Sequence, residues 1–383
     1  MADKVGNNRV HAAAAVEGKK TYEKTISQLR SELLTSVKRN DVSACDRILD
    51  QIQMQAEVGG APIHTLADKR LLDHDGRTFL YYALSHRSET VAQHYMKSGD
   101  LQLMTHKTGK FERSALTVII EKGLTQMLKV YLTELKKLDP KNFLENIRAN
   151  HGAAVLPTAH YIAGCKDPDD ESRNAMLDIL YQFDPGFVKL HCGHARDTPL
   201  HIAVKVNKPK IADKLLSLGA DADQKNKSNV SALSDATTNK KYEVLTIIIG
   251  HIRGSADKLK AMCQSEPREV LESILLFSVK HQMYDVAKEL LNHGITFHAF
   301  NSEEENIWTM ALKQNDAFDE ILKLYDAYGS KTPPGDALKS ARFKPPLHEC
   351  VKRNDFDKLC ALVKAAKGSS VSAKSQIIFE SKV

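Results

Sequence analysis

The chain has 383 residues, which is enough for two or three compact domains or for one extended repeat array. Hydrophobic residues make up 42% and charged residues 27%, which is typical of a folded globular protein and excludes a disordered chain. Aromatic residues are only 6%, so a large aromatic-rich sandwich or barrel core is not expected. The net charge of +6 is too small to identify a partner by itself.

Membrane insertion and disulfide bonding are not expected. The longest apolar runs, such as residues 245–250, are far shorter than the ~18 residues of a membrane helix, and the N-terminus lacks the apolar core of a signal peptide. Six cysteines are scattered without a Cys-x-x-Cys pair, as is typical of buried thiols in a reducing compartment. We therefore expect a soluble cytoplasmic protein.

The first half of the chain reads as a flexible tail followed by helices. Residues 1–20 are rich in Ala, Gly and Lys and have no apolar periodicity, which predicts a flexible tail. From residue 21 to 367, apolar residues recur at helical spacing, and a Ser or Thr that can cap a helix precedes many of the runs. We expect helices to start near residues 31, 78, 114 and 158.

The clearest helical pair lies in residues 197–221. Thr198 can cap a helix, and Pro199 suits the first helical position, where its missing N–H has no consequence. Gly219 supplies the left-handed residue that ends a second helix beginning near Lys210. The segment therefore predicts a helix, a tight turn and a second helix.

The pair is repeated along the chain. Ser231 begins a copy 33 residues after Thr198 (231 − 198 = 33), and a gap-free copy of the strong pair covers residues 275–295. The string Val-Lys-Arg-Asn-Asp at residues 37–41 recurs at residues 351–355, so the first and last units are alike. The expected starts are at residues 31, 78, 114, 158, 198, 231, 273, 306 and 345, and their spacings of 33 to 47 residues predict several long connecting loops.

The string Thr198, Pro199, Leu200, His201, x, Ala203 resembles the signature of ankyrin repeats, whose usual period is 33 residues. The resemblance implies an all-α ankyrin-repeat solenoid over residues 21–367, with about nine stacked helix-turn-helix units and degenerate terminal units. Neighbouring hairpins stabilise one another in such an array. A helical-hairpin solenoid of another family is the structural alternative. Degenerate units with long loops also resemble effectors that intracellular bacteria export into a host cytosol.

The resemblance places partner binding on the concave side of the array. Nine of eighteen positions at the exposed ends of the first helices are Lys or Arg, and Glu121 is their one acid, which favours an acidic protein segment as the partner. The alternative is that these cations only complement the helix dipole. The candidate partner-binding residues are Lys38, Arg39, His86, Lys110, Arg113, Lys122, Lys166, His194, Arg196, Lys205, Lys280, Lys313, Lys352 and Arg353.

Catalytic, metal and cofactor chemistry has little support. His191, Cys192 and His194 form one His/Cys cluster, but zinc needs four ligands and a second pair is missing, so no metal is expected. A cysteine hydrolase using Cys192 or Cys165, within residues 139–197, is the enzymatic alternative, although no nucleophile signature surrounds either thiol. No phosphate-binding glycine loop occurs, so neither a cofactor nor a small-molecule substrate is expected.

Nucleic acid is disfavoured as a partner, because the groove lacks interleaved aromatic residues. Residues 368–383 are rich in Ser and Lys and predict a second flexible tail, whose last three residues resemble a PDZ-binding carboxy-terminus. The sequence therefore predicts a non-enzymatic protein-binding module.

Overall fold

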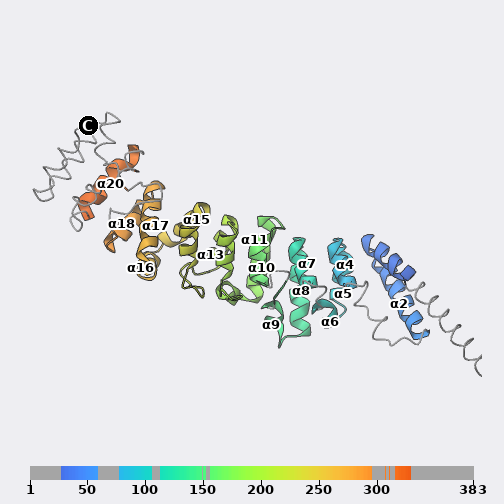
Figure 1. Cartoon of the computed structure of the whole chain (residues 1–383). Helices are drawn as coiled ribbons and strands as arrows, with labels where there is room; N and C mark the ends of the chain where they lie inside the picture. The colour runs from blue at the N-terminus through green and yellow to red at the C-terminus, as the bar shows by residue number, and fades with distance from the viewer. Residues whose placement is uncertain are drawn as a thin grey trace, which may run out of the picture. The chain divides into compact units, whose positions relative to one another are not determined.

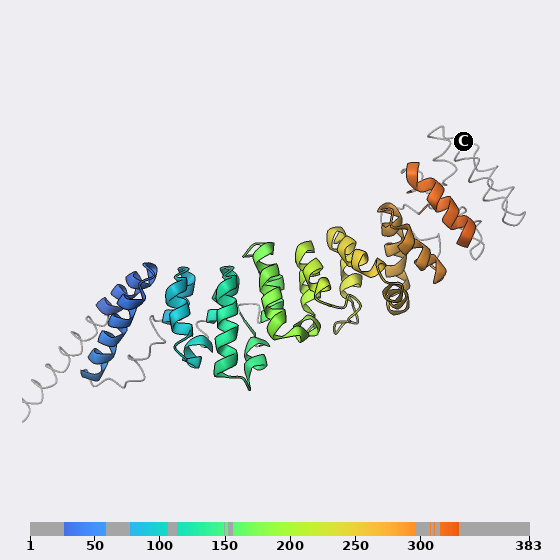
Figure 2. The same cartoon turned by 180° about the vertical axis from the view of Figure 1, so that it is seen from behind.

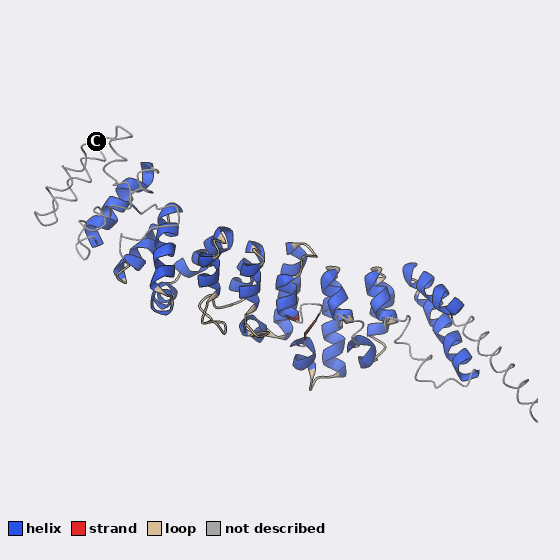
Figure 3. Cartoon of the chain, viewed as in Figure 1, coloured by secondary structure: helices blue, strands red, loops and turns tan. Residues whose placement is uncertain are grey.

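The computed structural model describes residues 27–58, 77–105, 113–148, 150–151, 156–295, 307, 310 and 315–328. These residues are mostly helical, as Figure 3 shows, which confirms the expected all-α class. Two compact units divide the chain, Met1–Asp221 and Ala222–Val383. The predicted tails, residues 1–20 and 368–383, and the unit expected from residue 345 lie outside the described residues.

The first unit is a series of helical pairs that follow one another along the chain. Figures 1 and 2 show α4 and α5, α7 and α8, α10 and α11, and α12 and α13 side by side from opposite directions. The described elements are a helix over residues 27–38, α2 (Val42–Val58), α4 (Phe79–Ser85), α5 (Glu89–Met96), α6 (Leu101–Thr105), α7 (Ala115–Glu121), α8 (Thr125–Leu138), α9 (Phe143–Arg148), β1 (Asn150–His151), β2 (Leu156–Pro157), α10 (Thr158–Gly164), α11 (Asp170–Phe183), the 3-10 helix η1 (Pro185–Lys189), α12 (Pro199–Lys205) and α13 (Pro209–Ser217). β1 and β2 pair antiparallel, with Asn150 opposite Pro157.

The helices of the first unit form two layers. In one layer α5, α8, α11 and α13 pack in succession, and in the other α4 packs on α7 and α10 packs on α12. Between them lie buried residues such as Leu80, Leu128, Leu177 and Leu215. Helices α7 and α10 pack on each other less closely than α4 packs on α7 or α10 packs on α12.

Local sequence signals explain where the short first helices begin and end. Four predicted cap residues each accept a backbone N–H through the side-chain oxygen, namely Thr78, Ser114, Thr198 and Ser231. Each helix that follows has seven residues, and the tight turn after it contains a residue in the left-handed region. These residues are Arg87, Gly123, Asn207 and Lys240. Gly219 also has a positive φ, +92°, as the sequence predicted for the end of a second helix.

The unit expected to start at Thr158 is shifted by one residue. Its cap position is Pro157, and the hydroxyl of Thr158 donates to the carbonyl oxygen of Ile147 instead of capping α10. The shift places His160, not Tyr161, at the position that His201 occupies in α12. The register predicted for this unit was therefore wrong by one residue, because the Thr is used to anchor the preceding helix.

Where the structure describes them, several of the long spacings between units contain additional or longer helices. The helix containing Ser31 spans residues 27–38, and α17 (Arg268–Lys280) begins before Ser273, so neither serine is a cap. The second helices α8 and α11 have 14 residues each, and α6, α9 and η1 occupy the connections that follow second helices. The expectation of long loops was wrong at these connections, since apolar residues such as Leu103 and Phe143 bury additional short helices against the array.

The second unit repeats the same local pattern. It contains α14 (Ala232–Thr238), α15 (Tyr242–Arg253), α16 (Ala256–Ser265), α17, α18 (Tyr284–Asn292) and α20 (Asn315–Tyr328). Helix α14 packs on α15 and α17, and α16 packs on α15 and α18. Lys225 lies 2.8 Å from the buried carboxylate of Glu266 and ties the loop before α14 to the end of α16. No helix in the described part of the chain combines the length and apolarity needed to cross a membrane.

Candidate functional site

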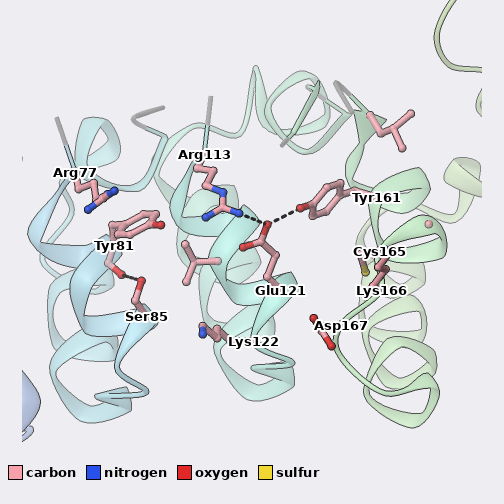
Figure 4. A pocket seen from close by; sticks show the side chains of 13 residues that line it. Arg77, Tyr81, Ser85, Arg113, Glu121, Lys122, Tyr161, Cys165, Lys166 and Asp167 are labelled. Carbon is pink, nitrogen blue, oxygen red and sulfur yellow. Dashed lines mark hydrogen bonds and ion pairs between the residues drawn. The ribbon is translucent and has the colours of Figure 1, made fainter. Parts of the chain in front are cut away.

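The first unit contains a cavity of about 910 Å³ on the face formed by α4, α7 and α10. Figure 4 shows its side chains projecting from these three helices and the segments beside them. Its lining includes residues of both α7 and α10, which pack only loosely on each other. It is lined by Arg77, Tyr81, Ser85, Arg113, Val118, Glu121, Lys122, Leu156, Tyr161, Gly164, Cys165, Lys166 and Asp167.

Glu121, the last residue of α7, lies at the centre of the cavity. Its Oε1 is 3.3 Å from the Arg113 guanidinium and accepts a 2.6 Å hydrogen bond from the hydroxyl of Tyr161 on α10 (Figure 4). The Glu121 side chain is 24% exposed, whereas that of Arg113 is 44% exposed. Burial and the hydrogen bond to Glu121 raise the pKa of Tyr161, so its hydroxyl remains a donor at neutral pH.

The contacts continue from Arg113 to the neighbouring repeat. Burial opposes the charge of Arg113, but hydrogen bonding with Tyr81 and the charge of Glu121 raise its guanidinium pKa overall. The Arg77 guanidinium lies 5.9 Å from the centroid of the Tyr81 ring, within the range of a cation–π contact. Side chains from three successive helical pairs therefore meet in one continuous row.

Two lysines border the other side of the cavity. Lys122 is the C-cap residue of α7, and its carbonyl oxygen accepts a 2.8 Å hydrogen bond from Arg87 of the preceding unit. Lys166 follows α10, and this segment is held by Arg173, which is fully buried and donates to the Cys165 carbonyl at 2.7 Å. Both lysine side chains are exposed, so their ammonium groups are accessible to a ligand.

One predicted groove lysine is held by an acid of its own unit. Lys205, the last residue of α12, forms an ion pair with Asp197, which precedes the cap of the same helix. Arg113 and Glu121 are also eight positions apart across α7, but with the two charges exchanged. The positive charge of Lys205 is therefore partly compensated within its own unit, and its role in partner binding stays a prediction.

The structure brings only some of the predicted site residues together. Arg113, Lys122 and Lys166 line the cavity. Other predicted residues of the first unit are exposed but lie outside the cavity lining, namely Lys38, Arg39, His86, His194, Arg196 and Lys205. Lys280 is exposed in the second unit. Lys110, Lys313, Lys352 and Arg353 lie outside the described residues.

Sequence reasoning missed four polar residues of the cavity, namely Arg77, Tyr81, Tyr161 and Asp167. Arg77 directly precedes the cap residue Thr78, just as Arg113 directly precedes the cap residue Ser114. The position before each cap is therefore the sequence signal that identifies Arg77. Tyr161 was not detectable in this way because the register of its unit was shifted. The contacts of Glu121 with Arg113 and Tyr161 depend on how neighbouring helices face each other, and the spacing of residues along the sequence does not encode this.

The thiols of Cys165 and Cys192 lack the lowered pKa that is typical of a nucleophile. Burial raises the pKa of Cys192 and of Cys165 to about 11, whereas a nucleophilic thiol needs a lowered pKa. His191 Nδ1 lies 2.6 Å from the carbonyl oxygen of Arg196, across the loop before α12. The described residues contain no group of three or more His, Cys, Asp or Glu side chains placed to hold a metal ion.

Comparison with known proteins gives the family of the central repeat. Residues 196–227 match the family model described as "Ankyrin repeat". A putative ankyrin repeat protein L371 of Acanthamoeba polyphaga mimivirus is 27% identical over 123 residues, which are 31% of this chain and 15% of that protein. The chain therefore spans only a small part of that relative's length.

Solved structures with similarity to this chain include two ankyrin repeat domains. The domain of Bcl-3, a member of the IkappaB protein family, is 14% identical and has a TM-score of 0.38, with 76% of this chain and 97% of that domain covered. An ankyrin repeat domain from Acinetobacter baumannii AYE is 17% identical and has a TM-score of 0.33, with 54% and 96% covered.

The matched segment coincides with the helical pair α12 and α13, in which Thr198 caps the first helix and His201 Nδ1 accepts a hydrogen bond from the Thr198 backbone N–H. Residues 196–227 form an ankyrin repeat, and the chain is similar in sequence to an ankyrin repeat protein over 123 residues.

Proposed function

We propose that this protein binds an acidic segment of another protein in the cavity formed by α4, α7 and α10. Ankyrin repeats are generally protein–protein interaction modules, and stacked repeats present extended surfaces for that purpose. The observation that supports the site is its charge. Four cationic side chains, Arg77, Arg113, Lys122 and Lys166, line the cavity against two acidic ones, Glu121 and Asp167, which leaves a net charge of +2.

The cations are not equivalent in this proposal. Arg113 already contacts Glu121, whereas Lys122 and Lys166 are exposed at the rim. Their long side chains can reach a carboxylate that enters between α7 and α10. Exposed ammonium groups contribute mainly to association rate and salt dependence, and each is worth only about 0.2–1 kcal/mol. The tyrosines supply flat surface and hydrogen-bonding groups beside these charges.

The proposal is tested with a short fluorescein-labelled peptide of alternating glutamate and serine. Fluorescence anisotropy should show binding that weakens as salt rises, and the Lys122→Ala/Lys166→Ala variant should bind several-fold more weakly than wild type. Lys129→Ala/Lys141→Ala, at two exposed lysines outside the cavity lining, is the matched control because it removes the same two charges away from the cavity. Equal affinity of the double variant and wild type contradicts the site, and equal binding of a lysine–serine peptide contradicts the charge preference.

The raised thiol pKa values give the cysteine-hydrolase alternative no support, and we do not propose it. A role as a bacterial effector in a host cytosol stays a prediction from the sequence.

A further inference from the structure

We infer that Glu121 acts as an internal competitor for the cavity, so that an acidic segment binds by replacing its carboxylate. The inference rests on the proposed function, and it identifies which residue of the site limits affinity and specificity. Glu121 lies at the centre of the lining, and its Oε1 meets Arg113 and Tyr161 together. A guanidinium and a hydroxyl converging on one carboxylate oxygen form the arrangement that would hold a carboxylate of a partner.

The geometry separates Glu121 from the other acid of the cavity. Asp167 also lines the cavity, but its side chain is exposed, beyond the end of α10. Glu121 is 24% exposed and lies between donors that come from two different repeats, as Figure 4 shows. Both acids repel an anionic ligand through space, but only Glu121 occupies Arg113 and Tyr161. Removing the charge of Glu121 or of Asp167 therefore reduces the long-range repulsion of the ligand in the same way. Only the removal of the Glu121 charge also weakens the contacts that compete for Arg113 and Tyr161.

Helix α12 also has an ion pair between the residue before its cap and its last residue, but the acidic and basic positions are exchanged relative to α7. There Asp197 precedes the helix and Lys205 ends it, which is the reverse of Arg113 and Glu121. In α7 the acid is the residue nearer the rim lysine, Lys122, and it lowers the positive potential where a ligand carboxylate would enter. The cavity is therefore selective against acidic segments that cannot displace Glu121.

The test compares Glu121→Gln with Asp167→Asn in the full chain. Glutamine keeps an oxygen that can accept from Tyr161 and Arg113, so the lining is preserved while the charge is removed. With the glutamate–serine peptide, Glu121→Gln should bind about five- to tenfold tighter than wild type, because the ligand no longer competes with an internal charge-assisted contact. Asp167→Asn should change the affinity by less than about twofold. Circular dichroism confirms that both variants keep their helices.

The outcomes distinguish this inference from the proposed function. Equal tightening by the two variants, or none, overturns the competitor role, because the acids then act only through general electrostatics or not at all. A glutamine–serine peptide should gain nothing from Glu121→Gln, and an equal gain for this neutral peptide also overturns it. If Lys122→Ala/Lys166→Ala still weakens binding in that case, the proposed site stands and only the role of Glu121 is lost. If no variant changes peptide binding, both fail.

Discussion

Lowering the pH should destabilise the first unit through His160. This side chain is fully buried, and its Nε2 lies 3.0 Å from the carbonyl oxygen of Asp197 in the next repeat, so Nε2 carries the proton of a neutral ring. Burial lowers the pKa of His160 from 6.5 to about 4, and hydrogen bonding to Asp197 offsets this only in part.

The sign of the effect follows from proton binding. At pH 7 the ring is neutral in the folded chain and mostly neutral in the unfolded chain, so His160 contributes little pH dependence there. Between pH 6.5 and about 4 the unfolded chain binds a proton that the folded chain does not. Stability should therefore fall by about 1.4 kcal/mol per pH unit in this window, and by about 3 kcal/mol in total.

The assay is urea unfolding of wild type and His160→Gln at pH 7, 6 and 5, followed by circular dichroism at constant ionic strength. The variant lacks the titrating ring, so any stability advantage of wild type at pH 7 should shrink by about 2 kcal/mol at pH 5. The comparison cancels the contributions of the other histidines. Parallel pH profiles for the two proteins would refute the reasoning, because they would show that His160 does not remain neutral in the folded chain.

Three further predictions concern packing and reactivity. A Cβ at Gly164 would lie 2.8 Å from Cγ2 of Ile202 in the next repeat, so Gly164→Ala should lower the urea midpoint by an amount equivalent to about 1–3 kcal/mol. Adding Ile202→Ala to this variant should restore part of the lost stability. A midpoint unchanged by Gly164→Ala contradicts this packing. Arg173 is buried and donates to Asp170, so Arg173→Ala should destabilise the chain by about 3–5 kcal/mol. The variant should also weaken peptide binding, because Arg173 no longer holds the segment that carries Lys166. Normal stability of the variant would show that the ion pair is dispensable. Burial raises the pKa of four described thiols to about 11, namely those of Cys45, Cys165, Cys192 and Cys263. These thiols should react with a thiol reagent at pH 8 much more slowly in the folded chain than after unfolding. Rapid labelling of Cys192, located by peptide mapping, would revive the enzymatic alternative.

The sequence by itself determined the class of fold and the framework of the central units. Thr198, Pro199 and Gly219 act through local physics, because a cap, a first-turn proline and a left-handed glycine stabilise or end a helix wherever they occur. The same local signals located the caps at Thr78 and Ser114. They failed where a side chain had a longer-range use, as at Thr158, whose hydroxyl holds the end of α9.

Only the tertiary structure decided which charged residues act together. Counting along the chain placed both Lys205 and Lys122 among the groove-facing positions, but Asp197 pairs with the first, while the second is exposed at a cavity. The row from Arg113 through Glu121 to Tyr161 joins residues that are far apart in sequence and meet because two helical pairs stack. Electrostatic interactions depend on distance in space and on burial, and neither is written in the spacing of residues along the chain.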